Sequence, residues 1–193
     1  MDYYQIIDNF LTPDECQKLI QVSEDIGYVP ADISFPKAQG GPRMIPTYRN
    51  NDRVLYQSEA LRKLIHIRLA ARNEIPPTYT RQLTNTEQLT TDFVEVSGLF
   101  RFYRYSEGHF FKKHRDGSER TDKGISRITI LIYLNTVEDG GNTNLIDFIL
   151  PEKVVVQPIV GRLLMFDHCI MHEGEAVNSG LKYLIRTDLI YNG

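Results

Sequence analysis

The chain has 193 residues, a formal net charge of −3, 41% hydrophobic and 24% charged residues, and only two cysteines. This composition is typical of one globular domain with a sizeable core, and it argues against a disulfide framework, a broadly basic nucleic-acid-binding protein and a membrane helix of roughly 20 apolar residues. The first ten residues carry two acidic side chains and no basic stretch, so they do not form a signal peptide, and we expect a cytoplasmic protein.

The N-terminal segment predicts a strand followed by a helix. Residues 3–10 are typical of a short strand. Thr12 can cap a helix whose first position is Pro13, and Glu15 completes a capping box. The helix should end near Gly27.

Residues 28–52 are rich in proline, glycine and asparagine and predict a long irregular loop, which is either functional or plain solvated chain. An amphipathic pattern predicts a second helix over residues 58–72. We expect one more short helix in the polar stretch 83–91. The polar side chains of the loop that could overhang a site are Arg43, Arg49, Asn50 and Arg53.

From residue 94 onward, short apolar or alternating runs are separated by turn residues. The runs are residues 99–105, 110–113, 126–134, 144–150, 153–157, 163–167 and 183–191. Many short strands at regular spacing predict an antiparallel sandwich or barrel. We therefore expect one compact, mainly β unit with supporting helices, in which a helical and loop region (1–95) supports a jelly-roll domain (96–193).

A candidate metal site begins at His114 and Asp116, which follow a strand-like run. Residues i and i+2 of extended backbone point to the same side, so one segment presents an imidazole and a carboxylate together. A third ligand would come from His168 or His172. Two histidines and one carboxylate leave positions open on iron(II). The triplet is also common by chance, and residues 116–118 are equally typical of a turn.

Residues 100–191 resemble the catalytic domain of the 2-oxoglutarate-dependent iron(II) oxygenases of the prolyl 4-hydroxylase type. The matching segments, in order, are FRFYRYSEGHFFKKHRDG, RITILIYLN, EDGGNTNL, GRLLMFDHCIMHEGEAVNSGLKY and LIRTDLIY. Two earlier segments, IIDNFLTPDECQKLI and RNNDRV, resemble the lead-in of the same family. The resemblance implies a double-stranded β-helix with iron at its open mouth.

The resemblance also implies the ligand set. The family's His-x-Asp pair falls on His114 and Asp116, and its distal histidine opens a pattern that here runs from His172 to Val177 and is followed by Lys182. The implied metal ligands and catalytic residues are therefore His114, Asp116 and His172, and not His168.

The co-substrate 2-oxoglutarate chelates iron with its keto acid, and its far carboxylate needs a buried cation. The family's lysine aligns with Lys182. Arg186 lies four residues further along the same strand, so both side chains should face the same way, and a guanidinium can hold a carboxylate with two hydrogen bonds. Lys182 is favoured, and Arg186 stays open. Tyr105 aligns with a tyrosine that hydrogen-bonds the co-substrate, although a core aromatic explains it equally well, and Thr129 is a further polar candidate without a family role.

The resemblance implies a dioxygenase that hydroxylates a substrate C–H bond and releases succinate and CO2. Its cofactors would be Fe(II) and 2-oxoglutarate, with ascorbate as a further candidate. Asp116 occupies the position that related halogenases leave to chloride, so hydroxylation is expected. The family name suggests a prolyl residue in a peptide, but fold and metal do not fix the substrate, and a small molecule stays open. Dioxygen is the other partner, and neither nucleic acid nor membrane is expected.

Three alternatives stay open. A nucleic-acid demethylase of the same superfamily would need a basic groove and stacking aromatics, which the net charge of −3 disfavours. A non-catalytic, cupin-like metal-binding module more often pairs His-x-His. A zinc site on His168, Cys169 and His172 lacks a second cysteine nearby.

Overall fold

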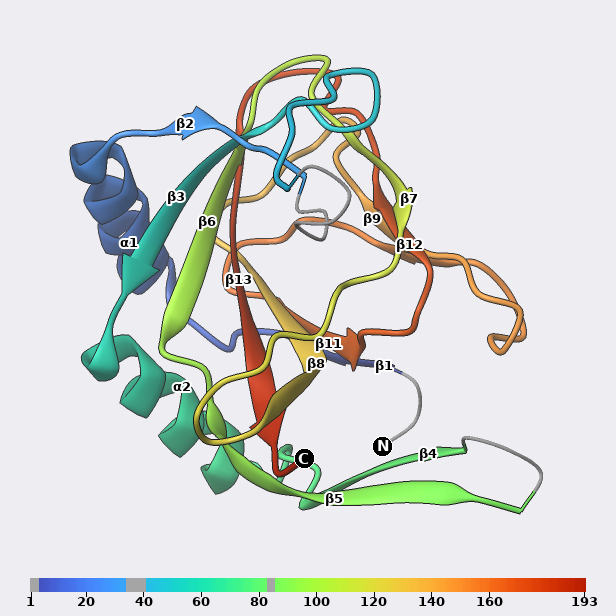
Figure 1. Cartoon of the computed structure of the whole chain (residues 1–193). Helices are drawn as coiled ribbons and strands as arrows, with labels where there is room; N and C mark the ends of the chain where they lie inside the picture. The colour runs from blue at the N-terminus through green and yellow to red at the C-terminus, as the bar shows by residue number, and fades with distance from the viewer. Residues whose placement is uncertain (1–3, 34–40, 83–85) are drawn as a thin grey trace.

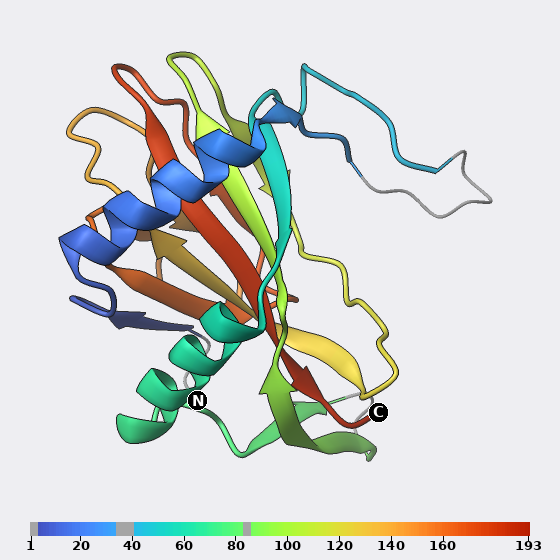
Figure 2. The same ribbon diagram turned by 90° about the vertical axis from the view of Figure 1, so that its left-hand side faces the viewer.

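Two antiparallel sheets pack against each other, and two helices cover the outer face of the larger one (Figures 1 and 2). The computed structural model describes residues 4–33, 41–82 and 86–193. Within this part of the chain the larger sheet has nine strands and the smaller has four. The predicted fold class, a mainly β jelly roll with supporting helices, is confirmed.

The larger sheet contains strands from both halves of the chain. Its order is β1 (Tyr4–Ile7), β11 (Leu163–Asp167), β8 (Ile125–Tyr133), β13 (Lys182–Tyr191), β6 (Leu99–Tyr105), β3 (Asp52–Gln57) and β2 (Val29–Pro30). The end of β13 also pairs with β5 (Gln88–Val96), which pairs with β4 (Thr78–Gln82). The smaller sheet has the order β10 (Val154–Val156), β9 (Thr143–Leu145), β12 (His172–Gly174) and β7 (Phe111–His114).

The two helices are α1 (Pro13–Ile26) and α2 (Glu59–Ala71). The predicted capping box is present, with Thr12 and Glu15 each accepting from the other's backbone N–H. Glu15 also forms a two-bond ion pair with Arg68 of α2 at 2.6 and 2.8 Å. One residue thus starts α1 and joins it to α2.

The core has two parts because successive side chains on a strand point to opposite faces. On β6, Phe100 and Phe102 pack beneath the helices, whereas Tyr103 and Tyr105 pack between the sheets. The inner face of β13 carries three charged residues among its apolar ones, Lys182, Arg186 and Asp188. Burying a charged side chain is costly unless it has a partner of opposite charge or binds a ligand. The charged residues on this inner face therefore indicate a functional site between the sheets.

The structure corrects two predicted elements. The predicted helix at 83–91 is wrong where the structure describes it, because residues 88–91 belong to β5, whose exposed and covered residues alternate; residues 83–85 lie outside the described residues. The predicted strand 144–150 is too long, since β9 ends at Leu145 and Asp147 turns the chain by accepting from the N–H groups of Ile149 and Met171.

The predicted loop at 28–52 is irregular over most of its described part. Its regular structure there is the short β2, two isolated bridges (Ile33 with Arg43, and Arg49 with Phe111) and the first residue of β3; residues 34–40 lie outside the described residues. β3 was not anticipated. The division of the chain at residue 95 stays a proposal, and the larger sheet includes β1, β2 and β3 from the proposed support region. None of the helices within the described residues is long and apolar enough to cross a membrane.

Gly161 allows a test of how the segment between β1 and α1 packs against the turn before β11. Its carbonyl accepts from the N–H groups of Phe10 and Leu11, its φ is 76°, and a Cβ there would lie 2.1 Å from the Leu11 carbonyl oxygen. Gly180 has a similar φ of 78°, but a Cβ there would meet no heavy atom within 4 Å. We expect Gly161→Ala to lower the unfolding free energy by about 3 kcal/mol or more, and Gly180→Ala by only about 1 kcal/mol, in urea titrations. Equal losses would show that the close approach to Leu11 is unimportant.

Candidate metal centre

Three candidate ligands meet where β7 and β12 pair. His114 is the last residue of β7, His172 is the first of β12, and the two lie opposite each other across the strand pair. Asp116 follows two residues after His114, and its backbone N–H bonds to the carbonyl of His168 at 3.1 Å. One ligand atom from each of His114, Asp116 and His172 lies within 4.8 Å of the others.

The two imidazoles are held in the form that binds metal. Nδ1 of His114 lies 2.8 Å from the Lys112 carbonyl, and Nδ1 of His172 lies 3.0 Å from the Ile170 carbonyl. A carbonyl only accepts, so each ring carries its proton on Nδ1 and turns the Nε2 lone pair toward Asp116, at 3.9 and 3.8 Å from its carboxylate oxygens. Burial lowers the pKa of His114 to about 3 and also lowers the pKa of His172. Both rings are therefore neutral at pH 7.

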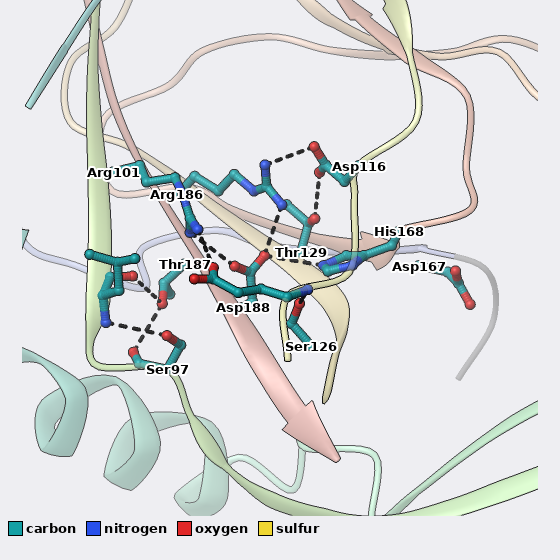
Figure 3. A network of polar contacts seen from close by, with 12 residues as sticks. Ser97, Arg101, Asp116, Ser126, Thr129, Asp167, His168, Arg186, Thr187 and Asp188 are labelled. Atoms are coloured by element: carbon teal, nitrogen blue, oxygen red, sulfur yellow. Dashed lines mark hydrogen bonds and ion pairs between the residues drawn. The ribbon is translucent and has the colours of Figure 1, made fainter. Parts of the chain in front are cut away.

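Asp116 is fixed by two partners (Figure 3). Arg186 Nη1 lies 2.9 Å from one carboxylate oxygen, and the Thr129 hydroxyl donates to the other at 2.6 Å. Burial opposes ionisation of Asp116, but the Arg186 guanidinium holds the pKa of that carboxyl well below its usual range. Two neutral imidazoles and one ionised carboxylate are the donor set of a facial iron(II) site, so the residues present fit that metal.

A second buried carboxylate completes the charge network beneath the site. Asp188 lies 3.1 Å from each of Arg186, Arg101 and His168 (Figure 3). The positive charge of Arg186 is thus shared between Asp116 and Asp188. His168 is buried and directed at Asp188, away from the group of candidate ligands.

Two cavities adjoin the candidate ligands. The outer one has a volume of about 900 Å³ and is lined by His114, Asp116 and residues of the loop before β3. The smaller inner one lies between the sheets and is lined by all three candidate ligands and by Lys182, Arg186 and Tyr105. Lys182 and Arg186 therefore face the same inner cavity.

Lys182 is a buried cation with an unusual environment. It is 1% exposed, lies over the rings of Tyr105 and Tyr133, and donates to the Gly141 carbonyl at 2.5 Å. Within the described residues no carboxylate lies at ion-pair distance from it, and Glu175, the acid that acts on it, pairs with Lys153. Burial lowers the pKa of Lys182 to about 7.

The zinc alternative receives no support from the geometry. In the part of the chain that the structure describes, the group placed to hold a metal is His114, Asp116 and His172, and it does not include Cys169.

The sequence did not predict the roles of two residues near the candidate ligands. Thr129 was considered without a role, although its place on the inner face of β8 could have suggested one, and the buried position of Arg49 has no signal in the sequence.

Comparisons with known proteins give a family for the segment that contains these residues. Residues 100–187, which contain all three candidate ligands, match the model of the 2OG-Fe(II) oxygenase superfamily. An uncharacterized protein of Fowlpox virus (strain NVSL) is 32% identical over 107 residues, which are 54% of this chain but only 24% of that protein. The chain thus spans about a quarter of that relative's length.

Similar solved structures cover nearly the whole chain. A prolyl-4-hydroxylase of Pseudomonas putida is 16% identical, with a TM-score of 0.66 and coverage of 99% of this chain and 94% of that chain. A prolyl hydroxylase of Trichoplax adhaerens, in complex with a hypoxia inducible factor peptide fragment, is 19% identical, with a TM-score of 0.71 and coverage of 98% and 84%. A viral collagen prolyl hydroxylase of Paramecium Bursaria Chlorella virus-1, in a 2OG complex, is 22% identical, with a TM-score of 0.62 and coverage of 100% and 97%. Residues 100–187 thus match the 2OG-Fe(II) oxygenase superfamily model, and the chain as a whole has a prolyl 4-hydroxylase-like fold.

Proposed function

We propose that this chain is an Fe(II)- and 2-oxoglutarate-dependent dioxygenase that hydroxylates a substrate C–H bond. The observation that carries the proposal is the convergence of neutral His114 and His172 with ionised Asp116 at the edge of a cavity. Bound iron(II), with 2-oxoglutarate and dioxygen, would supply the oxidant for hydroxylation and release succinate and CO2.

The chain's own residues would bind and orient these reactants. Lys182 would bind the far carboxylate of 2-oxoglutarate, because its charge is unpaired and it lines the inner cavity with the candidate ligands. Tyr105 packs under Lys182 and would shape the same pocket. Arg186 is better suited to position Asp116, since two carboxylates already share its charge.

A prolyl residue in a peptide is the first substrate to test. The similar Trichoplax adhaerens enzyme holds a peptide fragment, and the outer cavity here opens beside the candidate metal ligands. Dioxygen would be the second substrate, and ascorbate is retained as an additive for the assay. A cytoplasmic location is also proposed, because both cysteines are free.

The proposal predicts a weak visible charge-transfer band when the purified protein is mixed anaerobically with Fe(II) and 2-oxoglutarate. His114→Ala should lose the band, because it removes one of the three ligands. His66→Ala is the control. His66 lies on α2, stacks on Phe93 of β5 and is not among the candidate ligands. A folded, metal-loaded wild-type protein without the band would refute the oxygenase function.

A further inference from the structure

The outer cavity is basic although the protein is acidic. The chain carries a formal net charge of −3, yet six of the residues lining this cavity are arginine or lysine and three are aspartate or glutamate. Four of the six basic side chains have carboxylate partners within 4 Å. The other two are Lys113, which is exposed, and Arg49, which is buried.

Arg49 is held rigidly at the cavity wall. Its guanidinium carbon lies 4.5 Å from the ring centroid of Phe111 and 4.6 Å from that of Tyr103. Nε donates to the Asn51 side chain at 2.7 Å. Phe111 in turn stacks on the candidate ligand His114, with 3.5 Å between the ring centroids. Arg49 is therefore pre-oriented next to the metal site.

The charge of Arg49 lacks a counter-ion. It is only 5% exposed, and its Nη2 has no hydrogen-bond partner. Asp32 approaches it only through a backbone carbonyl, 3.5 Å from Nη1, because the Asp32 carboxylate pairs with Arg53 at 2.7 Å. Within the described residues no carboxylate lies at ion-pair distance from Arg49. A buried, unpaired cation is unfavourable unless a ligand completes it.

We propose that Arg49 binds a carboxylate of the substrate, and that the substrate class of this site is therefore acidic: an amino acid, or a peptide with a free carboxylate near the C–H bond that reacts. This inference rests on the proposed function. A guanidinium edge with one free Nη2 matches a planar carboxylate, which accepts hydrogen bonds in the guanidinium plane. The faces of the Phe111 and Tyr103 rings already contact the guanidinium, and Nη2 is buried without a hydrogen-bond partner, so it is the group left for a carboxylate.

The test compares acids with their own amides. Wild-type protein loaded anaerobically with Fe(II) and 2-oxoglutarate is titrated with free L-amino acids and their carboxamides, and with N-acetylated prolyl dipeptides carrying a free or an amidated C-terminus. Binding is followed as a shift of the charge-transfer band and by calorimetry. At least one acid should bind on the order of 100-fold more tightly than its amide, the range expected for a buried charge-assisted contact.

Variants assign that preference to Arg49. In Arg49→Met the ratio of acid to amide affinity should fall to near one, whereas a merely structural role would weaken both ligands equally. Arg49→Lys should keep part of the preference, because it keeps the charge without the planar fork. Lys113→Met is the matched control. It removes one charge from the same cavity at an exposed position, so the ratio should change by less than about fivefold.

The outcomes separate the two proposals. If the charge-transfer band never forms, the oxygenase function fails and the substrate class falls with it. If the band forms but no acid binds better than its amide, or Arg49→Met keeps the preference, only the role of Arg49 is refuted. A short single-stranded DNA that binds more tightly than every acid, in an Arg49-dependent way, would also overturn the carboxylate assignment and favour a phosphate-bearing substrate.

Discussion

His172→Ala is expected to lower the Fe(II) affinity of this protein by more than about 100-fold. Removing a residue that only hydrogen-bonds a metal ligand costs about 10- to 100-fold, and removing a ligand itself should cost more. His172 is 5% exposed, its Nδ1 proton is fixed on the Ile170 carbonyl, and Nε2 is left for the metal. No other described histidine is placed to replace it in the group of candidate ligands. Iron binding by calorimetry, and the charge-transfer band, should both be lost.

His168→Ala is the matched control, because His168 lies four residues earlier and is equally buried. Its Nε2 is directed at Asp188, at 3.1 Å. Removing it should destabilise the fold by about 1–3 kcal/mol, since the buried carboxylate loses one partner, while Arg101 and Arg186 remain. Iron affinity should fall less than about tenfold, because the orientation of Asp116 depends mainly on Arg186 and Thr129. The reverse order of effects would exchange the roles of the two histidines.

Sequence reasoning named the three residues that the structure brings together, because their signals are local or ordered along the chain. His114 and Asp116 lie two residues apart on extended backbone, and the segment from His172 to Lys182 follows a family pattern. The structure adds what these signals lack, namely that His172 lies directly opposite His114 in the β7–β12 pair. Such register depends on long-range pairing, which one sequence does not encode visibly.

The missed features have physical causes too. Residues 88–91, the start of β5, were included in a predicted helix because polar side chains hide the alternation, which becomes evident only from the covered Leu89, Thr91 and Phe93 between exposed neighbours. Arg49 was one of several loop cations, and nothing in the sequence distinguishes it from Arg53. Only the structure shows that Asp32 pairs with Arg53 and that Arg49 instead lies against two aromatic rings. Which of several neighbouring charged side chains form an ion pair depends on the folded structure and cannot be predicted from the sequence alone.

Lys182→Met is expected to weaken 2-oxoglutarate binding on the order of 100- to 1,000-fold, because the far carboxylate would enter the inner cavity without a cation. Fe(II) binding should persist, since Lys182 is not among the candidate ligands. The unfolding free energy should change by less than about 2 kcal/mol, as removal of a desolvated charge offsets the lost hydrogen bond to Gly141. Arg186→Met should instead disturb Fe(II) binding, because it removes the partner of Asp116.

The pH dependence of 2-oxoglutarate binding distinguishes Lys182 from Arg186 as the cation. Burial lowers the pKa of Lys182 to about 7, so the free protein loses this charge above that pH, and the ligand must then bind together with a proton. The dissociation constant should be flat below pH 7 and rise up to about tenfold per pH unit above it, until the higher pKa of the complex is reached. An arginine clamp stays charged and gives no such slope. Calorimetric titrations from pH 6 to pH 9 should show the slope in wild type and not in Lys182→Met; a slope retained in the variant would exclude Lys182 as its source.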